Sequence, residues 1–276
     1  MSRQSVGAYS ICYLEGELLA QNIELMYSYV DKFVVVIGQV EISTSNPLVI
    51  DVCSRKFLSK IDDPLNKLFI VDFEAYPTKD DMQNVAISLL DTDILLQLDA
   101  DEFWPEQVIE KSLLEIELGA ERVFIPHLIY VKSVRNVFSS SSKKDFYFSP
   151  PRVWKNIVDA NLGHFSGTWY KNGGFLTSKD AYLTYPYFIN HLGWVNKNQI
   201  KRKLNFYGRG RGYKMPPFTF FRLASLMKIA RVSIDMGPNK VKIVSNRNIR
   251  PPLEILDIFR KFSADKPCVR CENHGA

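Results

Sequence analysis

The sequence contains little cysteine and no long apolar run. Its four cysteines in 276 residues are too few for the disulfide framework of a small secreted domain. Residues 1–8 lack the basic and apolar regions of a secretory signal, and no segment has the length and hydrophobicity of a membrane-spanning helix. These absences argue against a secreted or membrane-spanning protein, and we expect a cytoplasmic one.

The sequence also lacks the glycine-rich loops that bind phosphate in many nucleotide-binding folds. No Gly-x-Gly-x-x-Gly follows the first apolar segment, and no Gly-x-x-x-x-Gly-Lys-Ser/Thr occurs in the chain. In those motifs, backbone amides surround the phosphate groups. A phosphate-containing ligand would therefore need another source of positive charge here, such as a metal ion.

The charge of the chain changes sign along its length. Residues 1–195 contain 17 Lys and Arg against 25 Asp and Glu, residues 196–250 contain 14 against 1, and residues 251–276 contain four of each. A basic segment of this kind can face nucleic acid, anionic lipid or an acidic substrate, or it can be a solvated surface. We expect a main domain over 1–195 and a basic, partly helical carboxyl-terminal extension over 196–276.

Apolar periodicity predicts an α/β fold. The apolar, strand-like segments are 6–14, 32–38, 49–53, 67–73 and 94–98. Helical patterns lie between them, and one of these opens with a capping box at Thr78–Asp81. Strands that alternate with helices through about residue 120 predict an open, mostly parallel sheet flanked by helices. From residue 121 to 195, short aromatic strands and long loops predict an α+β portion.

Three carboxylates follow the apolar run Ile94–Leu98, namely Asp99, Asp101 and Glu102. Carboxylates at the end of a buried strand repel each other and lose hydration, so they need a cation or strong hydrogen-bond donors. A divalent metal would supply this, although one carboxylate could instead cap the next helix. Ligands of open α/β sheets bind at the carboxyl ends of the strands. The sequence therefore predicts a metal-assisted site after residue 98.

Several of these segments together resemble the glycosyltransferases of the GT-A fold. The nearest patterns are the family 2 enzymes and the β-1,4-N-acetylglucosaminyltransferase family that modifies N-glycan cores, in which Asp-x-Asp-Glu follows a helix. The resemblance covers about Val6–Tyr207, and the segments that carry it are Glu17, Val30–Val35, Met82–Ala86, Asp99–Glu102, and His191–Val195 with Tyr207. This chain lacks the arginine of the family's Gln-Arg-Asn pattern, since Gln83 directly precedes Asn84.

This resemblance implies a metal-dependent, inverting transfer of a hexose or N-acetylhexosamine. The donor would be a UDP- or GDP-type sugar bound by residues 1–120, and the acceptor a saccharide or glycolipid hydroxyl bound by residues 121–195. Mg²⁺ or Mn²⁺ would neutralise the departing diphosphate. Asp101 would coordinate the metal, Asp99 would contact the ribose or the metal, and His191 would be a third ligand. An imidazole ligand favours Mn²⁺.

The resemblance also implies further donor contacts. Glu17 and Asn84 would contact the nucleotide sugar, with a helical surface role as the alternative for each. Arg209 and Arg211, in a glycine-rich basic loop, would close over the diphosphate.

The general base is expected among a small set of carboxylates. Asp180 is the first candidate because it precedes His191 by eleven residues, where related enzymes place the base. Asp145 and Asp159 follow it, and Glu102 is a further catalytic candidate that could bind the acceptor. A base of this kind must lie within hydrogen-bond reach of the acceptor hydroxyl.

Two other functions remain open at the level of sequence. A nucleotidyltransferase also uses paired aspartates, but it would need a basic glycine-rich loop where this chain has Glu15-Gly16-Glu17. A non-catalytic anion-binding protein would use the basic extension, with Phe218–Val232 as a helix on an anionic membrane surface at the cytoplasmic face. Nucleic acid is the weaker partner, because no RNA-binding aromatic motif or zinc finger accompanies the charge. The tail offers only Cys268, Cys271 and His274 toward a zinc site, which usually needs four ligands.

Overall fold

The computed structural model describes most of the chain up to residue 194 and three short segments beyond it. The described residues are 3–12, 15–40, 52–131, 133–140, 150–163, 167–194, 233–235, 240–245 and 256–258. The predictions for Arg209, Arg211, Asp145, Phe218–Val232 and the Cys268–His274 tail lie outside these residues.

The chain forms two compact units that alternate along the sequence. The first unit comprises Met1–Ile125, Pro150–Phe188 and Cys268–Ala276, and the second comprises Pro126–Ser149 and Ile189–Pro267. The division expected after residue 195 from the charge distribution remains a prediction.

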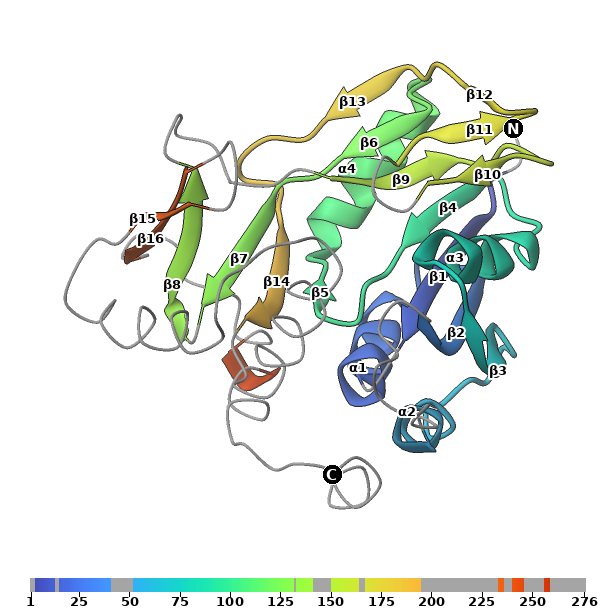
Figure 1. Cartoon of the computed structure of the whole chain (residues 1–276), viewed down its shortest axis with the longest axis horizontal. Helices are drawn as coiled ribbons and strands as arrows, with labels where there is room; N and C mark the ends of the chain where they lie inside the picture. Colours follow the sequence, from blue (N-terminus) through green and yellow to red (C-terminus); the bar gives the residue numbers. More distant parts are fainter. Residues whose placement is uncertain are drawn as a thin grey trace. The chain divides into compact units, whose positions relative to one another are not determined.

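The first unit contains a seven-stranded sheet with the order β13-β6-β9-β4-β1-β2-β3 (Figure 1). Its strands are β1 (Val6–Cys12), β2 (Lys32–Val40), β3 (Leu68–Tyr76), β4 (Ile94–Gln97), β6 (Arg122–Phe124), β9 (Pro151–Lys155) and β13 (Asp180–Tyr182). Only β9 is antiparallel to its neighbours. The predicted α/β class with a mostly parallel central sheet is confirmed.

The central strands are buried on both faces, which explains their continuous apolar sequences. Val34, Val35 and Val36 alternate between the two faces of β2, and each is at most 1% exposed. On one face, Val34 and Val36 join Tyr9 and Trp154 in a core that includes the apolar side of α3. Such two-sided burial is typical of parallel strands.

The described residues of this unit form four helices, namely α1 (Gly16–Met26), α2 (Val52–Leu58), α3 (Lys79–Ser88) and α4 (Glu106–Glu117). The predicted capping box of α3 is present, since the Asp81 amide donates to Thr78 Oγ1 at 3.1 Å and the Thr78 amide donates to Asp81 Oδ2 at 2.9 Å. The prediction of a strand over 49–53 is wrong for residues 52 and 53, because α2 begins at Val52. No helix among the described residues is long and apolar enough to cross a membrane.

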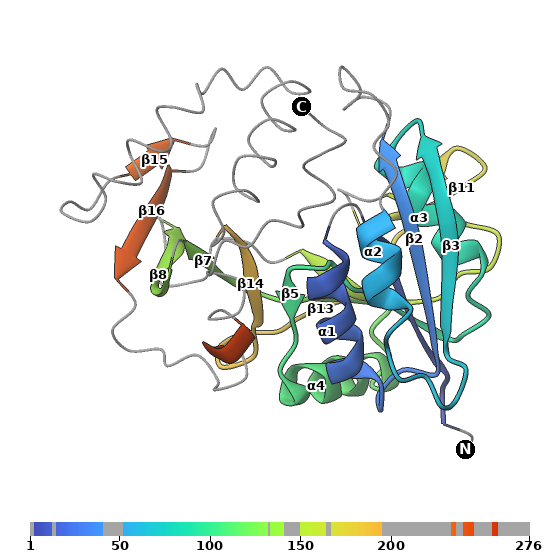
Figure 2. The same ribbon diagram turned by 90° about the horizontal axis from the view of Figure 1, so that it is seen from below.

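Helices α1 and α2 lie side by side (Figure 2), and Gly16 allows their close approach. The Gly16 amide donates to Ser54 Oγ at 2.9 Å. A Cβ atom at Gly16 would lie 2.2 Å from Ser54 Cα, closer than any real Cβ contact. The glycine at the start of α1 is therefore explained by helix packing.

Replacing Gly16 by alanine will lower the free energy of unfolding by about 1–3 kcal/mol, because α1 and α2 must separate. Urea denaturation measures the change. Gly174→Ala is the matched control, since its Cβ would meet nothing closer than Lys171 O at 3.8 Å. Equal effects of the two substitutions would contradict this packing.

The second unit contains strands β7 (His127–Val131), β8 (Ser133–Ser140), β14 (Ile189–Trp194), β15 (Ser233–Asp235) and β16 (Lys240–Ser245). Their order is β15-β16-β8-β7-β14, with antiparallel pairing except between β7 and β14. Residues of the expected carboxyl-terminal extension thus supply two strands, in addition to a short helical segment at 256–258.

Candidate active site

The predicted carboxylates lie at the carboxyl end of β4, in the middle of the seven-stranded sheet. Strand β4 runs parallel to β1, with Gln97 opposite Tyr9, so the loops that follow both strands emerge at the same edge. Glu17, exposed in the first turn of α1, follows β1, and Asp99 follows β4. The structure therefore brings Glu17 and the carboxylates to one edge of the sheet, as the sequence predicted.

A buried asparagine on α1 fixes the turn that carries the carboxylates. Asn22 has no exposed surface, and its Nδ2 donates to Asp99 O at 3.1 Å and also to Glu102 O. The Glu102 amide closes the turn by donating to Asp99 O at 3.0 Å. Asn22 was not predicted as a site residue, although it is visible as a polar residue within the apolar stripe of Leu19, Ile23 and Met26.

Arg152, on the antiparallel strand β9, binds two of the three carboxylates. Its Nε and Nη2 donate to Glu102 Oε2 and Oε1 at 2.7 and 2.6 Å, and Nη2 also donates to Asp99 Oδ2 at 3.0 Å. The side chains of Arg152 and Glu102 are 8% and 1% exposed, against 27% for Asp99. Arg152 is therefore the internal cation of this cluster.

The charges of this cluster depend on one another. Burial disfavours the charge of Arg152, but Glu102 and Asp99 outweigh this effect and raise its pKa. Burial raises the pKa of Glu102, and Arg152 opposes that rise. Both oxygens of Glu102 accept hydrogen bonds from the guanidinium, which is the arrangement of an ionised carboxylate with arginine. Glu102 and Arg152 thus form a buried salt bridge.

Asp99 is also oriented from β1. Gln97 Nε2 donates to Asp99 Oδ1 at 3.0 Å, and Tyr9 Oη donates to Gln97 Oε1 at 3.2 Å. Burial raises the pKa of Tyr9 well above its usual value, so the phenol keeps its proton and remains a donor. Each oxygen of Asp99 therefore has a donor within the protein, and its position is fixed before any ligand binds.

The oxygen donors at this edge fit a metal that binds together with a diphosphate. Asp101 is 4% exposed and lies two residues from Asp99. Among the described residues, no group of three or more His, Cys, Asp or Glu is placed to hold an ion. Mg²⁺ is commonly held by one or two carboxylates, with phosphates and water as its other ligands. Asp99 and Asp101 match that kind of site.

The structure does not support the predicted catalytic role of Glu102. A base or an acceptor ligand must reach the acceptor hydroxyl, whereas the Glu102 side chain is buried and both of its oxygens bind Arg152. Its position instead balances the charge of Arg152.

Asp180, the first candidate for the base, lies away from the carboxylate cluster. It begins the edge strand β13, where it pairs with Arg122 of β6. Arg122 in turn pairs with Trp154 of β9, and Trp154 pairs with Leu95 of β4. Asp180 is therefore three strands away from β4 and level with its amino-terminal half. Its oxygens accept from Arg122 Nε and Nη2 at 2.9 and 2.8 Å. The structure does not bring Asp180 to the site.

The Asp180–Arg122 pair makes stability depend on pH. Hydrogen bonds from Arg122 and Ser178 lower the pKa of Asp180, against the opposing effect of burial. A lowered carboxyl pKa stabilises the folded state above the usual aspartate pKa, and this stabilisation is lost as the pH falls through the lowered value.

Asp180→Asn will therefore lower the free energy of unfolding by about 1–2 kcal/mol at neutral pH, and the difference will vanish in strong acid. Denaturant unfolding at several pH values measures both. A difference that persists unchanged below the lowered pKa would show that the carboxylate charge is not responsible.

Asn84 is bound to a neighbouring strand. Its Nδ2 donates to Asp80 O at 2.7 Å and to Leu162 O at 3.1 Å, and its Oδ1 accepts from the Leu162 amide at 2.8 Å. The predicted contact of Asn84 with the nucleotide sugar is not supported, because its amide group already joins α3 to β10 (Asn161–Leu162). No sequence pattern distinguishes such a role from a ligand contact.

His191 lies in β14 of the second unit. Its Nδ1 accepts from the Gly193 amide at 3.1 Å, and its ring centre is 5.8 Å from that of His127. His127 is buried. Because His191 and the aspartates belong to different units, the prediction that His191 completes the metal site remains a prediction.

Comparisons with known proteins find similar solved structures, but no matching family model and no matching curated protein. A mannosyltransferase from Pyrobaculum calidifontis, solved with GDP-Man and Mn²⁺, is 14% identical with a TM-score of 0.44, over 83% of this chain and 71% of its own.

Two further solved structures are similar to parts of the chain. S. aureus TarS 1–349 is 12% identical with a TM-score of 0.41, over 76% of this chain and 72% of its own. The 4-diphosphocytidyl-2C-methyl-D-erythritol synthase from Anaerococcus prevotii is 13% identical with a TM-score of 0.35, over 55% of this chain and 70% of its own. TM-scores below 0.5 leave the functional conclusion to this chain's own residues.

Proposed function

We propose that this protein is a GT-A glycosyltransferase that transfers a sugar from a nucleoside-diphosphate sugar to a saccharide or glycolipid hydroxyl. The observation that carries the proposal is the turn after β4, which brings Asp99 and Asp101 to the carboxyl edge of a mostly parallel sheet and in which Asn22 and Arg152 hold Asp99. Ligands of open α/β sheets bind at this edge.

The proposed reaction forms one bond and breaks another at the anomeric carbon. The acceptor oxygen bonds to this carbon, the carbon's bond to the diphosphate oxygen breaks, and the acceptor proton passes to a base. Because Glu102 is buried and Asp180 lies elsewhere, the base is a group other than these two. Inversion at the anomeric carbon is part of the proposal and rests on the sequence resemblance.

Mg²⁺ or Mn²⁺ bound at Asp99 and Asp101 would neutralise charge on the departing diphosphate. The chain's own part is to present these two carboxylates, and hydrogen bonds from Gln97 and Arg152 hold Asp99 in place. Glu17, at the same edge, is proposed as a nucleotide contact, and Arg209 and Arg211 as contacts to the diphosphate.

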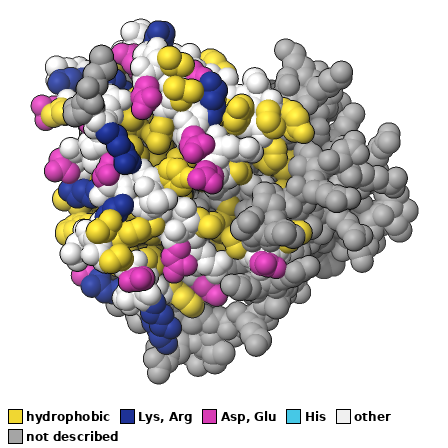
Figure 3. Space-filling model, turned by 180° about the vertical axis from the view of Figure 1, so that it is seen from behind, with side chains coloured by type: hydrophobic (Ala, Val, Ile, Leu, Met, Phe, Trp, Pro, Cys, Tyr) yellow, Lys and Arg dark blue, Asp and Glu magenta, His cyan; other side chains and the backbone are white. Residues whose placement is uncertain are grey.

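The anion-binding alternative depends on the basic residues 196–250, most of which lie outside the described residues. On the face shown in Figure 3, Lys and Arg side chains of the described residues are interspersed with Asp, Glu and apolar side chains. The nucleotidyltransferase alternative is weakened, because Gly16 is needed for packing against Ser54. A phosphate-binding loop after β1 would use its glycine for close approach to the phosphate.

Turnover of candidate donors separates these functions. The full chain is incubated with Mn²⁺ in two sets of reactions. One set contains UDP- or GDP-sugars, and the other contains nucleoside triphosphates together with sugar phosphates. The proposal predicts release of a nucleoside diphosphate from at least one sugar donor, and loss of this release with a chelator. Pyrophosphate release alone would indicate a nucleotidyltransferase. No turnover of any donor, together with tight binding to anionic vesicles or nucleic acid, would contradict the proposal.

A further inference from the structure

A small sheet outside the carboxyl edge presents an unusual outward face. It consists of β10, β11 (Trp169–Lys171) and β12 (Gly174–Phe175), paired antiparallel in that order. Asn161 lies opposite Tyr170, and Tyr170 lies opposite Phe175. Because directly opposed residues of a sheet point to the same side, these three side chains form one row.

The inward and outward faces of this sheet differ sharply. Leu162 and Trp169 point inward, at 0% and 3% exposure, and join the core beneath α3. On the outward face, Phe175 is 76% exposed and Asn161 is also exposed. The inward residues anchor the small sheet to the core, whereas the outward face leaves most of the Phe175 ring open to solvent.

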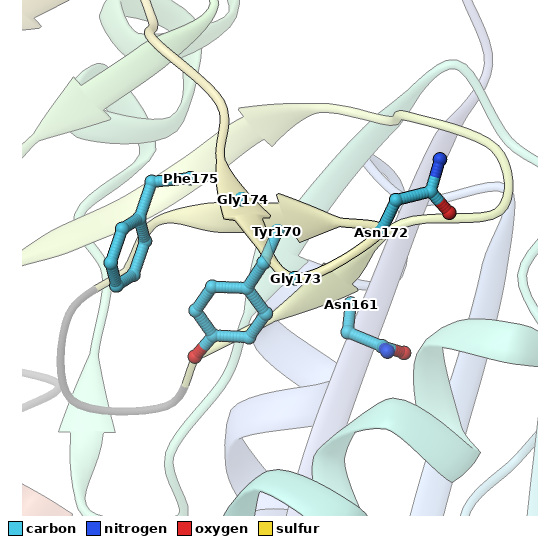
Figure 4. A pocket seen from close by; sticks show the side chains of 6 residues that line it. All are labelled: Asn161, Tyr170, Asn172, Gly173, Gly174 and Phe175. Atoms are coloured by element: carbon cyan, nitrogen blue, oxygen red, sulfur yellow. The ribbon is translucent and has the colours of Figure 1, made fainter.

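The outward row lines a cavity of about 260 Å³ (Figure 4). Its lining residues are Asn161, Tyr170, Asn172, Gly173, Gly174 and Phe175. In Figure 4, Tyr170 lies between Phe175 and Asn161. The rings of Tyr170 and Phe175 meet edge to face, with centroids 5.5 Å apart.

Two features keep the row in place. The hairpin between β11 and β12 turns at Asn172 and Gly173, whose φ angles of 52° and 78° match the tight turn that Asn-Gly favours. At the other end, β10 is fixed to α3 by hydrogen bonds from Gln83 and Asn84 to Leu162 O, at 2.9 and 3.1 Å. A preformed surface loses little conformational entropy when it binds a ligand.

We infer that the outward face of this sheet is a second saccharide-binding site, separate from the site of transfer. We call this face, which carries Asn161, Tyr170 and Phe175, the Tyr170–Phe175 platform. Aromatic side chains offer apolar surface to the C–H faces of a sugar ring, and asparagine amides both donate to and accept from hydroxyl groups. The cavity lining contains no charged side chain, which favours a neutral glycan over a phosphate-rich ligand.

The platform lies away from the carboxyl edge. Trp169 and Leu162 pack in the same core as Trp154. Trp154 pairs with Leu95 of β4, which precedes Asp99 by four residues. Figure 1 shows β10 near the beginning of β4 (Ile94–Gln97), and Asp99 follows the other end of that strand. The platform therefore fits a glycan held apart from the reacting groups, and its binding needs neither donor nor metal.

Saturation-transfer NMR on the full chain, without donor or metal, tests this inference. The probes are the neutral hexasaccharides of the cellulose, chitin, mannan and starch types, with a heparin hexasaccharide as the anionic probe. At least one neutral probe is expected to bind. Tyr170→Ala and Phe175→Ala will each weaken that binding about tenfold or more.

Two variants serve as controls. Tyr185→Ala removes a similarly exposed aromatic, 67% exposed, outside the platform, and Asp101→Asn changes the proposed donor site. Both should bind the glycan as the unmodified chain does. Loss of glycan binding in Asp101→Asn would instead place the glycan at the donor site.

Three results would overturn the inference. They are the absence of binding by any neutral probe, binding that is unchanged in the exposed-site variant Phe175→Ala, and binding of the anionic probe only. Self-association that Phe175→Ala abolishes, without glycan binding, would assign the platform to a second copy of the chain. Donor turnover can succeed or fail independently of each of these results.

Discussion

Replacing Arg152 by alanine will lower the free energy of unfolding by about 3–5 kcal/mol, because it leaves Glu102 buried without its charge partner. Glu102 is 1% exposed, and Arg152 supplies hydrogen bonds to both of its oxygens. Equilibrium unfolding in urea measures the loss. The same substitution also removes the hydrogen bond from Arg152 to Asp99 Oδ2. Turnover of the nucleotide sugar will therefore fall along with stability.

Two matched variants isolate the cause. The double change Arg152→Met with Glu102→Leu removes both charges and will recover much of the lost stability. It will not restore turnover, since Asp99 Oδ2 still lacks the hydrogen bond from Arg152. Lys32→Ala breaks the exposed pair with Asp91, 2.9 Å apart, and will change stability by less than about 1 kcal/mol. A loss of that small size in Arg152→Ala would contradict a buried ion pair.

Replacing Asp101 by asparagine will lower kcat/KM for the nucleotide-sugar donor by about 100-fold or more. The change removes one negative charge from the proposed metal site, and stabilisation of the leaving diphosphate by a metal is worth several kcal/mol. Steady-state release of nucleoside diphosphate, at several Mn²⁺ concentrations, measures the effect.

Asp62→Asn is the control for this substitution, because Asp62 is an exposed aspartate outside the site. It should leave kcat/KM unchanged. If Asp101→Asn retained full activity at every Mn²⁺ concentration, Asp101 would have no part in donor binding, even if the protein were a glycosyltransferase.

Local sequence patterns predicted the parts of the fold that depend on neighbouring residues. The apolar run before Asp99 is a buried central strand, and Thr78 caps α3 through Asp81. Both features arise from interactions within a few residues or from simple burial. The short apolar segment at 49–53 was misassigned because periodicity does not separate short strands from short helices.

The partners of the carboxylates were harder to predict. Arg152 lies 53 positions after Asp99, and only the antiparallel pairing of β9 with β4 brings them together. Asp180 was chosen for its sequence distance from His191, yet its place on the edge strand β13 directs it to Arg122. Strand order, which is a property of the whole sheet, decides both outcomes.

Asn22 is the partner that the sequence could have revealed. It stands where an apolar residue belongs on the buried side of α1, and a buried amide requires hydrogen-bond partners. Its partners are the backbone carbonyls of Asp99 and Glu102. A polar residue within an apolar stripe thus signals that the helix has a buried hydrogen-bond partner. Which backbone carbonyls serve as that partner depends on the fold.

The most direct test of the metal and diphosphate site is the thermal stability of the full chain with UDP or GDP, each with and without Mn²⁺. The account predicts that one nucleotide raises the Tm only when Mn²⁺ is present, and that Asp101→Asn abolishes this rise while Asp62→Asn preserves it. The absence of Mn²⁺-dependent stabilisation by either nucleotide, or an equal rise in Asp101→Asn, would contradict it.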